Sequence, residues 1–276
     1  MPFRSLLFTP ATRLDRLEKA LGSGADWVAL DLEDGVGPAD KSAARQALTE
    51  FASAGLGDVA HRTGVRINAP NQPDGVRDLA AMFDWPVWPG MLILPKVEAA
   101  SQVLQIVSLT EGRTCIFLLT LETAAGIANA VEIACAAPEG ALLGYGSADH
   151  MAETGGTITE PSLAYGRGAV VNAAAVAGVP AMDGVWLNYK DLDGLREEAE
   201  LVKSLGFAGK IAIHPDQIGP INAIFSPTED EITTARALIA ASDAAGGGAF
   251  AYNGKMVDAP VLARARRIMD ISRSNR

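Results

Sequence analysis

Short apolar runs alternate with helical segments along almost the whole chain of 276 residues, and this alternation limits the possible folds. A run that is apolar on both faces and is followed by an amphipathic or Ala-rich segment is typical of a parallel strand covered by helices. The predicted strands are Ser5–Phe8, Trp27–Asp31, Val65–Asn68, Met91–Leu94, Cys115–Leu121, Ala141–Tyr145, Ala181–Trp186 and Lys210–Ile213.

The segments between these runs predict helices, which makes the order of elements a regular strand–helix repeat. The predicted helices are Arg13–Leu21, Lys41–Ala54, Gly75–Phe83, Ala99–Ser108, Ile127–Ala137, Ser162–Ala177 and Leu192–Leu205. Such a repeat predicts an α/β fold, a closed (β/α)₈ TIM barrel, with a doubly wound open sheet as the alternative. Barrels of this length form one domain, and we assign residues 1–225 to it.

Residues 226–276 follow the last unit of the repeat and predict a C-terminal helical extension. Thr228 precedes three acidic residues and is a good N-cap, so it predicts the start of an Ala-rich helix. A last helix is expected over Ala259–Ser272. The extension could pack on its own barrel or on a neighbouring subunit.

The net charge of −10 restricts the partners of the chain. Nucleic acid and anionic membrane surfaces both require a basic footprint, so we expect neither as a partner. The apolar run near the N-terminus is too short for a secretory signal. Cys115 and Cys135 have neither a disulfide pattern nor metal-ligand spacing, which predicts a cytoplasmic protein.

Polar side chains collect where the predicted strands end, which is where parallel barrels carry their catalytic groups. Buried charges need partners, so this set is expected to form a connected site. Its members are Thr9, Pro10, Glu33, Asp34, Arg66, Asn68, Lys96, Glu122, Asp149, Asp183 and His214.

Glu122 and Asp149 are the predicted metal ligands. Each follows an apolar strand and has small neighbours, and two carboxylates with water and a chelating substrate can complete the octahedral shell of Mg²⁺ or Mn²⁺. Alternatively, each is a helix N-cap or a first-turn acid. Glu33 and Asp34 are expected to hold metal-bound water or a basic neighbour.

Arg66, Lys96 and His214 are the basic members of the set. Arg66 could stabilise an enolate oxygen, or it could form an internal salt bridge with Glu33 or Asp34. Lys96 could form a Schiff base, but beside two metal ligands an electrostatic role is favoured. His214 could be a base, although a histidine before proline after a strand more often makes a structural hydrogen bond.

With these residues in place, the sequence resembles the citrate lyase β-subunit-like branch of the HpcH/HpaI aldolase family, and in particular malyl-CoA and citramalyl-CoA lyases. The resemblance extends over nearly the whole chain. The matching segments are RSLLFTPA (4–11), GADWVALDLEDGVGPADKSAAR (24–45), VRINAPN (65–71), LPKVEAA (94–100), LETAAGI (121–127), GSAD (146–149), GVPAMDGVW (178–186), KIAIHPDQI (210–218) and GKMVDAPVLARA (254–265).

The resemblance implies a magnesium-containing barrel that assembles as a homo-oligomer, with a trimer favoured. It implies that Glu122 and Asp149 hold the metal and that Arg66 binds substrate and steadies a thioester enolate. It also implies that Asp258 reaches a neighbour's site as a general acid/base, although Asp258 is equally suited to cap the last helix. Arg4, Thr9, Pro10, Arg13 and His214 would lie near CoA or the pocket mouth.

One departure from the superfamily pattern bears on the reaction. Pyruvate aldolases of the superfamily carry a histidine base after the second strand, and the segment LEDGVGPAD has none. We therefore expect a Mg²⁺-dependent carbon–carbon lyase that cleaves or forms a 3-hydroxyacyl-CoA, with an acyl-CoA or keto acid as its small-molecule partner. The alternatives are a citrate lyase β subunit acting on an acyl-carrier thioester, an aldolase on free keto acids, and a metabolite-binding barrel without turnover.

Overall fold

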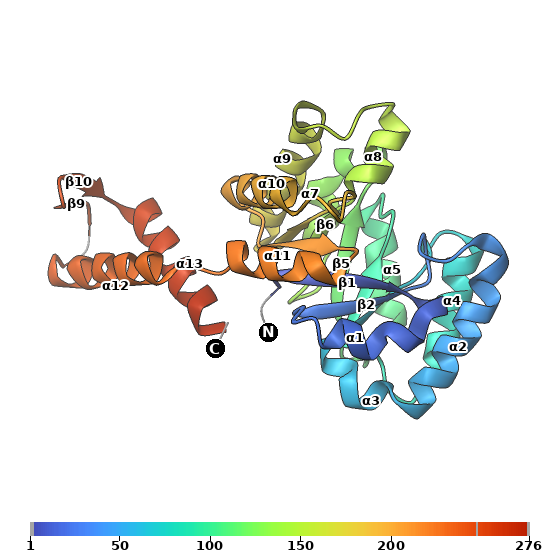
Figure 1. Cartoon of the computed structure of the whole chain (residues 1–276). Coiled ribbons are helices and arrows are strands. Elements are labelled where there is room, and N and C mark those ends of the chain that lie inside the picture. The colour runs from blue at the N-terminus through green and yellow to red at the C-terminus, as the bar shows by residue number, and fades with distance from the viewer. Residues whose placement is uncertain (1–2, 247, 275–276) are drawn as a thin grey trace. The chain divides into compact units, whose positions relative to one another are not determined.

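Eight parallel strands close into a barrel in the computed structural model, which describes residues 3–246 and 248–274 (Figure 1). The first strand pairs with both the second and the last, so the predicted barrel is confirmed and the open-sheet alternative is wrong. The strands are β1 (Ser5–Pro10), β2 (Trp27–Asp31), β3 (Thr63–Arg66), β4 (Met91–Leu94), β5 (Ile116–Leu121), β6 (Leu142–Tyr145), β7 (Ala181–Asp183) and β8 (Gly209–Ala212).

Helices connect the strands and lie around the outside of the barrel. The predicted helix Ile127–Ala137 is divided at Asn129, whose amide donates a hydrogen bond to the Glu98 carbonyl oxygen at 2.8 Å. The helices of this region are η1 (Ala11–Arg16), α1 (Leu17–Leu21), η2 (Pro38–Asp40), α2 (Lys41–Ala54), α3 (Leu56–Val59), η3 (Ala60–Arg62), α4 (Pro73–Phe83), α5 (Ala100–Leu109), α6 (Ala124–Ala128), α7 (Ala130–Cys135), α8 (Ser147–Thr154), α9 (Glu160–Ala177), α10 (Leu192–Leu205), η4 (Pro215–Gln217) and α11 (Ile218–Phe225).

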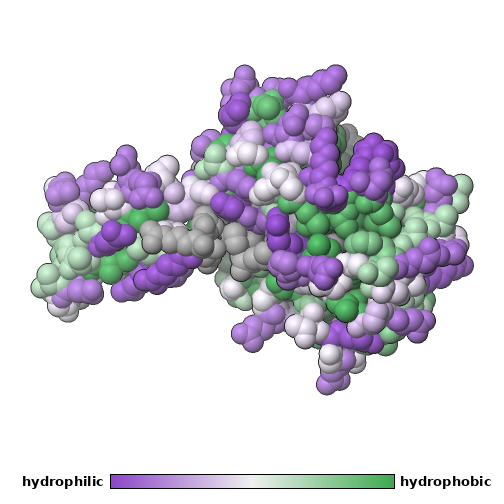
Figure 2. Space-filling view, turned by 60° about the horizontal axis from the view of Figure 1, so that its bottom comes forward, coloured by the Kyte–Doolittle hydropathy of each residue, from purple (hydrophilic) through white to green (hydrophobic). Residues whose placement is uncertain are grey.

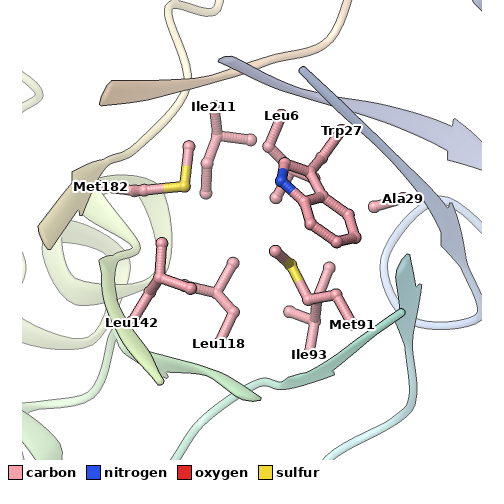
Figure 3. Packing of buried hydrophobic residues seen from close by; sticks show 9 residues of the cluster. All are labelled: Leu6, Trp27, Ala29, Met91, Ile93, Leu118, Leu142, Met182 and Ile211. Atoms are coloured by element: carbon pink, nitrogen blue, oxygen red, sulfur yellow. The ribbon is translucent and has the colours of Figure 1, made fainter. Parts of the chain in front are cut away.

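Apolar side chains fill the inside of the barrel, so the barrel is a packed core and not a pore (Figure 3). On β3 the inward position is Gly64, where an added Cβ would stand 3.3 Å from the Met91 Cβ atom. The core side chains come from β1, β2, β4, β5, β6, β7 and β8, and they are Leu6, Trp27, Ala29, Met91, Ile93, Leu118, Leu142, Met182 and Ile211.

The pleat of the strands decides which polar residues face the site. Side chains alternate between the two faces of a strand, so Asp31 lies two residues beyond the core residue Ala29 on the same face of β2. Asp31 is paired in register with Arg66 on β3. The carboxyl ends of the strands therefore carry a polar layer directly above the apolar one.

Residues from Ala223 onward form a second compact unit, distinct from the unit Phe3–Asn222 that contains the barrel. It consists of the end of α11, α12 (Glu229–Ala244), the hairpin β9 (Phe250–Tyr252) and β10 (Lys255–Val257), and α13 (Ala259–Ser274). Thr228 caps α12 as predicted, since its Oγ1 accepts a hydrogen bond from Glu231 N. The hairpin was not predicted, although its turn, Asn253-Gly254, has positive φ at both residues and is a strong sequence signal.

The surface combines hydrophilic residues with smaller hydrophobic patches, one face of which is shown in Figure 2. One apolar groove of about 260 Å³ lies between α4 and α5, with Leu79, Phe83 and Ile106 among its lining residues. Within the described residues, no helix has the length and apolar character needed to cross a membrane.

Candidate active site

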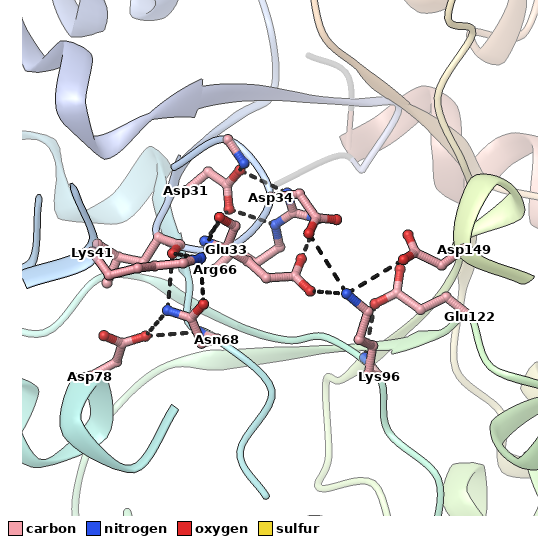
Figure 4. A network of polar contacts seen from close by, with 12 residues as sticks. Asp31, Glu33, Asp34, Lys41, Arg66, Asn68, Asp78, Lys96, Glu122 and Asp149 are labelled. Atoms are coloured by element: carbon pink, nitrogen blue, oxygen red, sulfur yellow. Dashed lines mark hydrogen bonds and ion pairs between the residues drawn. The ribbon is translucent and has the colours of Figure 1, made fainter. Parts of the chain in front are cut away.

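Four acidic side chains gather around Lys96 at the carboxyl ends of β2, β4, β5 and β6 (Figure 4). Glu122 directly follows β5 and Asp149 lies in the first turn of α8, after β6. Glu33 and Asp34 follow β2. Strands that are distant along the chain thus deliver these groups to one place, as expected when parallel strands end at the same rim.

Lys96 contacts all four of these carboxylates. Its Nζ atom lies 2.6 Å from Glu33 Oε1, 3.4 Å from Asp149 Oδ1 and 3.7 Å from Asp34 Oδ1. Its backbone N–H donates to Glu122 Oε1 at 2.8 Å. Partial burial would lower the pKa of Lys96, but the hydrogen bond that its ammonium donates to Glu33 and the charges of the nearby acids raise this pKa above its ordinary value, so the ammonium stays charged.

Arg66 is held by the carboxylates of Asp31 and Glu33. Glu33 therefore contacts Lys96 through one oxygen and Arg66 through the other. Its Nε and Nη2 atoms donate to the two oxygens of Asp31, each at 2.7 Å, and Nη1 lies 2.9 Å from Glu33 Oε2. The guanidinium also lies over the Phe8 ring, 4.2 Å from its centroid. Burial would lower the pKa of Arg66, but Asp31, Glu33 and Glu122 raise it. The internal ion pair with Glu33 is therefore present, while Asp31 takes the place expected for Asp34.

Asp31 is the site residue that the sequence analysis missed. It ends an apolar strand just as Glu122 follows one, so the signal was available in the segment ALDLED. The segment contains three acids, and the sequence alone favoured Glu33 and Asp34 as the site residues after this strand. Asp31 also accepts hydrogen bonds from the backbone N–H groups of Glu33 and Gly35, and so shapes the loop that carries Glu33.

Lys41 and Asn68 donate hydrogen bonds that fix the loop after β2. The Lys41 ammonium donates to the carbonyl oxygens of Leu32 and Glu33 and to Asn68 Oδ1, at 2.9, 2.6 and 2.6 Å. The Asn68 amide in turn donates to Asp78 Oδ2 at 2.6 Å. These contacts tie the loop after β2 to α2 and α4, so Glu33 has a fixed position.

Glu122 is buried at the tip of its strand, with an exposed fraction of 3%. Burial raises the pKa of Glu122 to about 8, and the negative charges of Glu33 and Asp149 act in the same direction. Burial likewise raises the pKa of Glu33, although Arg66 and Lys96 oppose the shift. Concentrated acids that resist ionisation are a frequent mark of a functional site and favour a bound cation.

The arrangement offers a magnesium ion two neighbouring carboxylates but no third protein ligand among the described residues. Glu122 and Asp149 share Lys96 as a neighbour, and Gly146 leaves the space at Glu122 open, because a Cβ there would stand 2.2 Å from Glu122 Oε2. Among the described residues, no group of three or more His, Cys, Asp or Glu side chains is arranged to hold a metal. Two carboxylates can hold Mg²⁺ when water and substrate supply its other ligands.

Comparison with known proteins shows the family. Residues 4–215 match the family described as HpcH/HpaI aldolase/citrate lyase. The chain belongs to this family. The matched region spans the whole barrel and every site residue named above.

Individual members of the HpcH/HpaI family are similar to nearly the full length of the chain. Citrate lyase subunit beta of Leuconostoc mesenteroides is 34% identical over 289 residues, with 99% of this chain and 94% of that protein covered. L-malyl-CoA/beta-methylmalyl-CoA lyase of Cereibacter sphaeroides is 33% identical, with 97% and 94% covered. These relatives make the family one of carbon–carbon lyases.

A solved structure of an HpcH/HpaI family member resembles the fold closely. Protein CitE from Mycobacterium tuberculosis, in complex with magnesium, acetoacetate and coenzyme A, superposes with a TM-score of 0.82 at 36% identity. The match covers 98% of each chain. That family member therefore binds magnesium, acetoacetate and coenzyme A on the same fold.

Other residues that the family resemblance selected lie apart from the acidic cluster. Arg13 pairs with Asp15 at 2.8 Å in η1, where both side chains are largely exposed. Pro10 ends β1 at the same rim as the site. His214 Nδ1 accepts a hydrogen bond from Asp216 N at 3.3 Å, and its ring stacks on Tyr189, so it makes the structural hydrogen bond considered for it.

Two predicted positions are wrong. Arg4 precedes β1 and pairs with Asp26, which precedes β2, at 2.6 Å. It therefore lies at the amino ends of the strands, opposite the site. Asp183 faces outward from β7, because its neighbour Met182 occupies the inward face.

Asp183 belongs to a buried ion-pair network between the barrel and its outer helices. It accepts hydrogen bonds from Lys210 on β8 at 2.5 Å and from Arg167 on α9 at 3.0 Å. Glu198 on α10 contacts both cations, each at 2.7 Å, and Glu160 contacts Arg167. These charges neutralise one another, which explains how they remain buried, and they contribute nothing to the acidic cluster.

Asp258 lies in the second compact unit, at the start of α13. Its Oδ1 atom is 3.4 Å from the backbone N–H of Val261, and its carbonyl oxygen accepts from Leu262 N at 3.1 Å. Asp258 therefore has the position of a helix cap, and its predicted catalytic role stays a prediction.

Proposed function

We propose that the chain is a Mg²⁺-dependent lyase that cleaves or forms a 3-hydroxyacyl-CoA such as citramalyl-CoA or malyl-CoA. The products of cleavage would be acetyl-CoA and pyruvate or glyoxylate. The observation that carries the proposal is the convergence of Glu122 and Asp149 on Lys96, with Arg66 held beside them by Asp31 and Glu33. Family membership and the magnesium- and CoA-containing relative support it.

In this proposal Glu122 and Asp149 would hold the ion, and Lys96 would keep its contacts with Glu33 and Asp34 beside them. When bound, Mg²⁺ supplies Lewis-acid polarisation to the hydroxyl and carboxylate groups of the substrate. Glu122 must lose its proton to act as a ligand, and the nearby Lys96 backbone N–H stabilises its ionised form. The proposal applies equally to Mn²⁺, which accepts the same oxygen ligands.

Arg66 has the task of stabilising the enolate. In the proposed cleavage, Asp258 acts as general base and takes the proton of the substrate hydroxyl, the adjacent carbon–carbon bond breaks, and the electron pair of that bond becomes the enolate of the acetyl thioester. Two of the Arg66 N–H groups donate to Asp31, and Nη1 forms an ion pair with Glu33 Oε2 at 2.9 Å. The remaining N–H groups of the guanidinium make no hydrogen bond within the described part of the chain. They can bind the enolate oxygen at the moment its charge develops, with no reorganisation of the guanidinium.

Asp258 is the proposed acid that returns a proton to the enolate carbon. We assign it to the site of a neighbouring copy, so the active form would be a homo-oligomer, with a trimer favoured. Within one chain Asp258 lies at the start of α13, where its Oδ1 atom is 3.4 Å from Val261 N. General acid catalysis of this kind typically contributes about 10²–10⁴-fold to the rate.

Incubation of the purified chain with malyl-CoA and citramalyl-CoA, with and without Mg²⁺, tests the proposal by mass spectrometry. We expect acetyl-CoA with glyoxylate or pyruvate, dependent on the ion. Glu122→Ala and Asp149→Ala should each abolish the Mg²⁺-dependent cleavage, whereas Gly168→Ala on α9 should have normal activity, since nothing lies within 4 Å of its added Cβ. Normal turnover by Glu122→Ala, or no cleavage of any CoA thioester, would overturn the proposal.

A second candidate is a citrate lyase β subunit that uses an acyl-carrier thioester. The similarity to the Leuconostoc mesenteroides subunit favours it. The same site residues would serve, because the cleaved bond is the same in kind and only the thioester carrier differs. Activity of the isolated chain on CoA thioesters would exclude this candidate, and activity only with an acyl-carrier protein would establish it.

A further inference from the structure

Lys96 has a backbone conformation that few lysines adopt. Its φ of 51° lies in the left-handed region, and Asn253 is the other non-glycine residue with positive φ in the described part of the chain. Such a conformation is unfavourable for a residue with a side chain, because Cβ crowds the backbone, and glycine would avoid this strain. A lysine at this position therefore indicates that its ammonium group has a function.

The left-handed backbone allows Lys96 to act at two places simultaneously. Its N–H is directed at Glu122 Oε1, while its side chain extends to Glu33 and Asp149. The two predicted metal ligands are thus held by different ends of one residue. Glu33 is also the carboxylate that contacts Arg66, so Lys96 connects the ion site to the guanidinium.

We propose that Lys96 is a positioning residue whose ammonium is the resident counter-ion of the acidic cluster and competes with the divalent ion for Asp149. The inference rests on the proposed function, since it takes Glu122 and Asp149 as the metal ligands. On binding of the ion, Asp149 would lose its contact with the Lys96 ammonium, and Lys96 would keep its hydrogen bond to Glu33.

The unequal distances identify the contact that gives way. The ammonium lies 2.6 Å from Glu33 Oε1, a strong charge-assisted hydrogen bond, but 3.4 Å from Asp149 Oδ1. Asp149 is also the less enclosed partner, because its side chain is 35% exposed whereas that of Glu33 is 5% exposed. Lys96 can therefore yield Asp149 without releasing Glu33 or the Arg66 guanidinium that Glu33 contacts.

Two consequences follow for binding of the ion. In the metal-free protein, Lys96 reduces the repulsion between Glu33, Asp34 and Asp149, so it stabilises the fold. In the metal-bound protein, its positive charge remains close to the ion and weakens binding. A lysine here therefore sets the divalent-ion affinity below the value that the acidic cluster would otherwise give.

Mn²⁺ binding to the full chain, followed by the electron paramagnetic resonance signal of the free ion, tests the inference. Lys96→Met removes the ammonium but keeps the backbone N–H to Glu122 and most of the aliphatic stem. We expect it to bind Mn²⁺ about tenfold more tightly, the size of effect that loss of one charge near a partly exposed ion pair gives. Lys96→Arg keeps the charge and should stay within about twofold of the parent chain.

Lys19→Met is the matched control, since Lys19 is exposed on α1 and the variant has the same net charge as Lys96→Met. Its Mn²⁺ affinity should be unchanged. Thermal unfolding supplies a second readout: in a chelator, Lys96→Met should melt below the parent chain, and Mn²⁺ should raise its melting temperature by more than it raises that of the parent chain. Lys96→Gln replaces Lys96→Met if the latter does not fold.

Each result decides a different point. A neutral variant at position 96 that is folded and binds Mn²⁺ with equal or lower affinity than the parent chain would overturn the inference about Lys96 and leave the metal site intact. Absence of Mn²⁺ binding by both the parent chain and the neutral variants would overturn the metal assignment, and the inference with it. Tighter binding in Lys96→Met together with an unchanged Lys19→Met would support both.

Discussion

Asp31 and Arg66 form a paired, two-bond contact at the carboxyl ends of β2 and β3, with both distances at 2.7 Å. The contact is in register, because the two residues are direct neighbours across the sheet. It orients the guanidinium so that its other edge remains available beside Glu33. The Asp31 carboxylate therefore determines the direction in which Arg66 can donate.

Asp31→Asn should reduce both stability and turnover, because it leaves Arg66 with one carboxylate in place of two. Removing one partner of a buried ion pair costs about 3–5 kcal/mol, and Asp31 is 2% exposed. Urea unfolding measures the loss, and steady-state kinetics should show a lower kcat. Asp15→Asn removes an exposed acid that also pairs with an arginine, and it should leave the free energy of unfolding essentially unchanged, because exposed ion pairs are screened by solvent. Equal losses in the two variants would contradict the structural role of Asp31.

The raised pKa of Glu122 predicts how metal binding depends on pH. Burial raises this pKa from 4.5 to about 8 in the metal-free chain, so below pH 8 the ion must displace a proton. The apparent Mn²⁺ affinity should then rise by about tenfold per pH unit between pH 6 and 7.5 and level off above pH 8, since one proton is released per ion bound. Titration calorimetry at several pH values measures this slope, and Glu122→Gln should abolish most of the binding.

The same group makes the stability of the metal-free protein fall as the pH rises from about 4.5 to about 8. A carboxyl whose pKa is higher in the folded than in the unfolded state contributes stability that is complete below pH 4.5 and is lost as the pH rises through about 8. Denaturant unfolding in a chelator should therefore show this loss over that interval, and added Mn²⁺ should reduce it. Glu122→Gln has no proton to lose there, so a parent-like loss in this variant would assign the effect to another group.

Gly146→Ala should damage the metal site more than the fold. An added Cβ would stand 2.2 Å from Glu122 Oε2 and 2.3 Å from Glu122 Cβ, so the carboxylate must move. We expect a destabilisation of about 1–3 kcal/mol and a clear loss of Mn²⁺ affinity. Gly168→Ala adds the same methyl group in an open helical position and should be neutral or slightly stabilising. Normal Mn²⁺ binding by Gly146→Ala would show that Glu122 is not a ligand.

Asp183→Asn should lower the free energy of unfolding without changing the Mn²⁺ affinity of the folded protein. It removes the carboxylate between Arg167 and Lys210, both of which are fully buried, so we expect a loss of about 3 kcal/mol or more in unfolding free energy. The network faces the outer helices, so Mn²⁺ affinity of the folded variant should stay within about twofold, because distant sites act independently. A large change in Mn²⁺ affinity would instead connect this network to the site.

Asp258→Asn should leave metal binding intact and slow hydrogen exchange at the methyl group of acetyl-CoA, as expected when a general acid is lost. Nuclear magnetic resonance in D₂O measures the exchange, and an unchanged rate would exclude Asp258 as the acid. Mixing Asp258→Asn with Glu122→Ala tests whether it acts across subunits. If it does, the mixed oligomers contain some intact sites and regain partial activity, whereas a site within one chain would regain none.

Much of the barrel followed from local sequence patterns. The bounds of β2, β4, α2 and α10 agree with the predicted ranges, because each is a periodic or continuous apolar segment with clear ends. The hairpin at Asn253-Gly254 could also have been predicted, since its turn residues are diagnostic.

The sequence by itself determined the repeat of strands and helices and the presence of acids at the strand ends, because both depend on residue spacing and polarity within short segments. Only the tertiary structure decided that Asp183 faces outward and that Asp31 pairs with Arg66. It also decided that Lys96 contacts Glu33, Asp149 and Glu122 together. The pleat, the register between strands and a left-handed residue set these directions, and each arises from contacts between segments that are far apart in the chain.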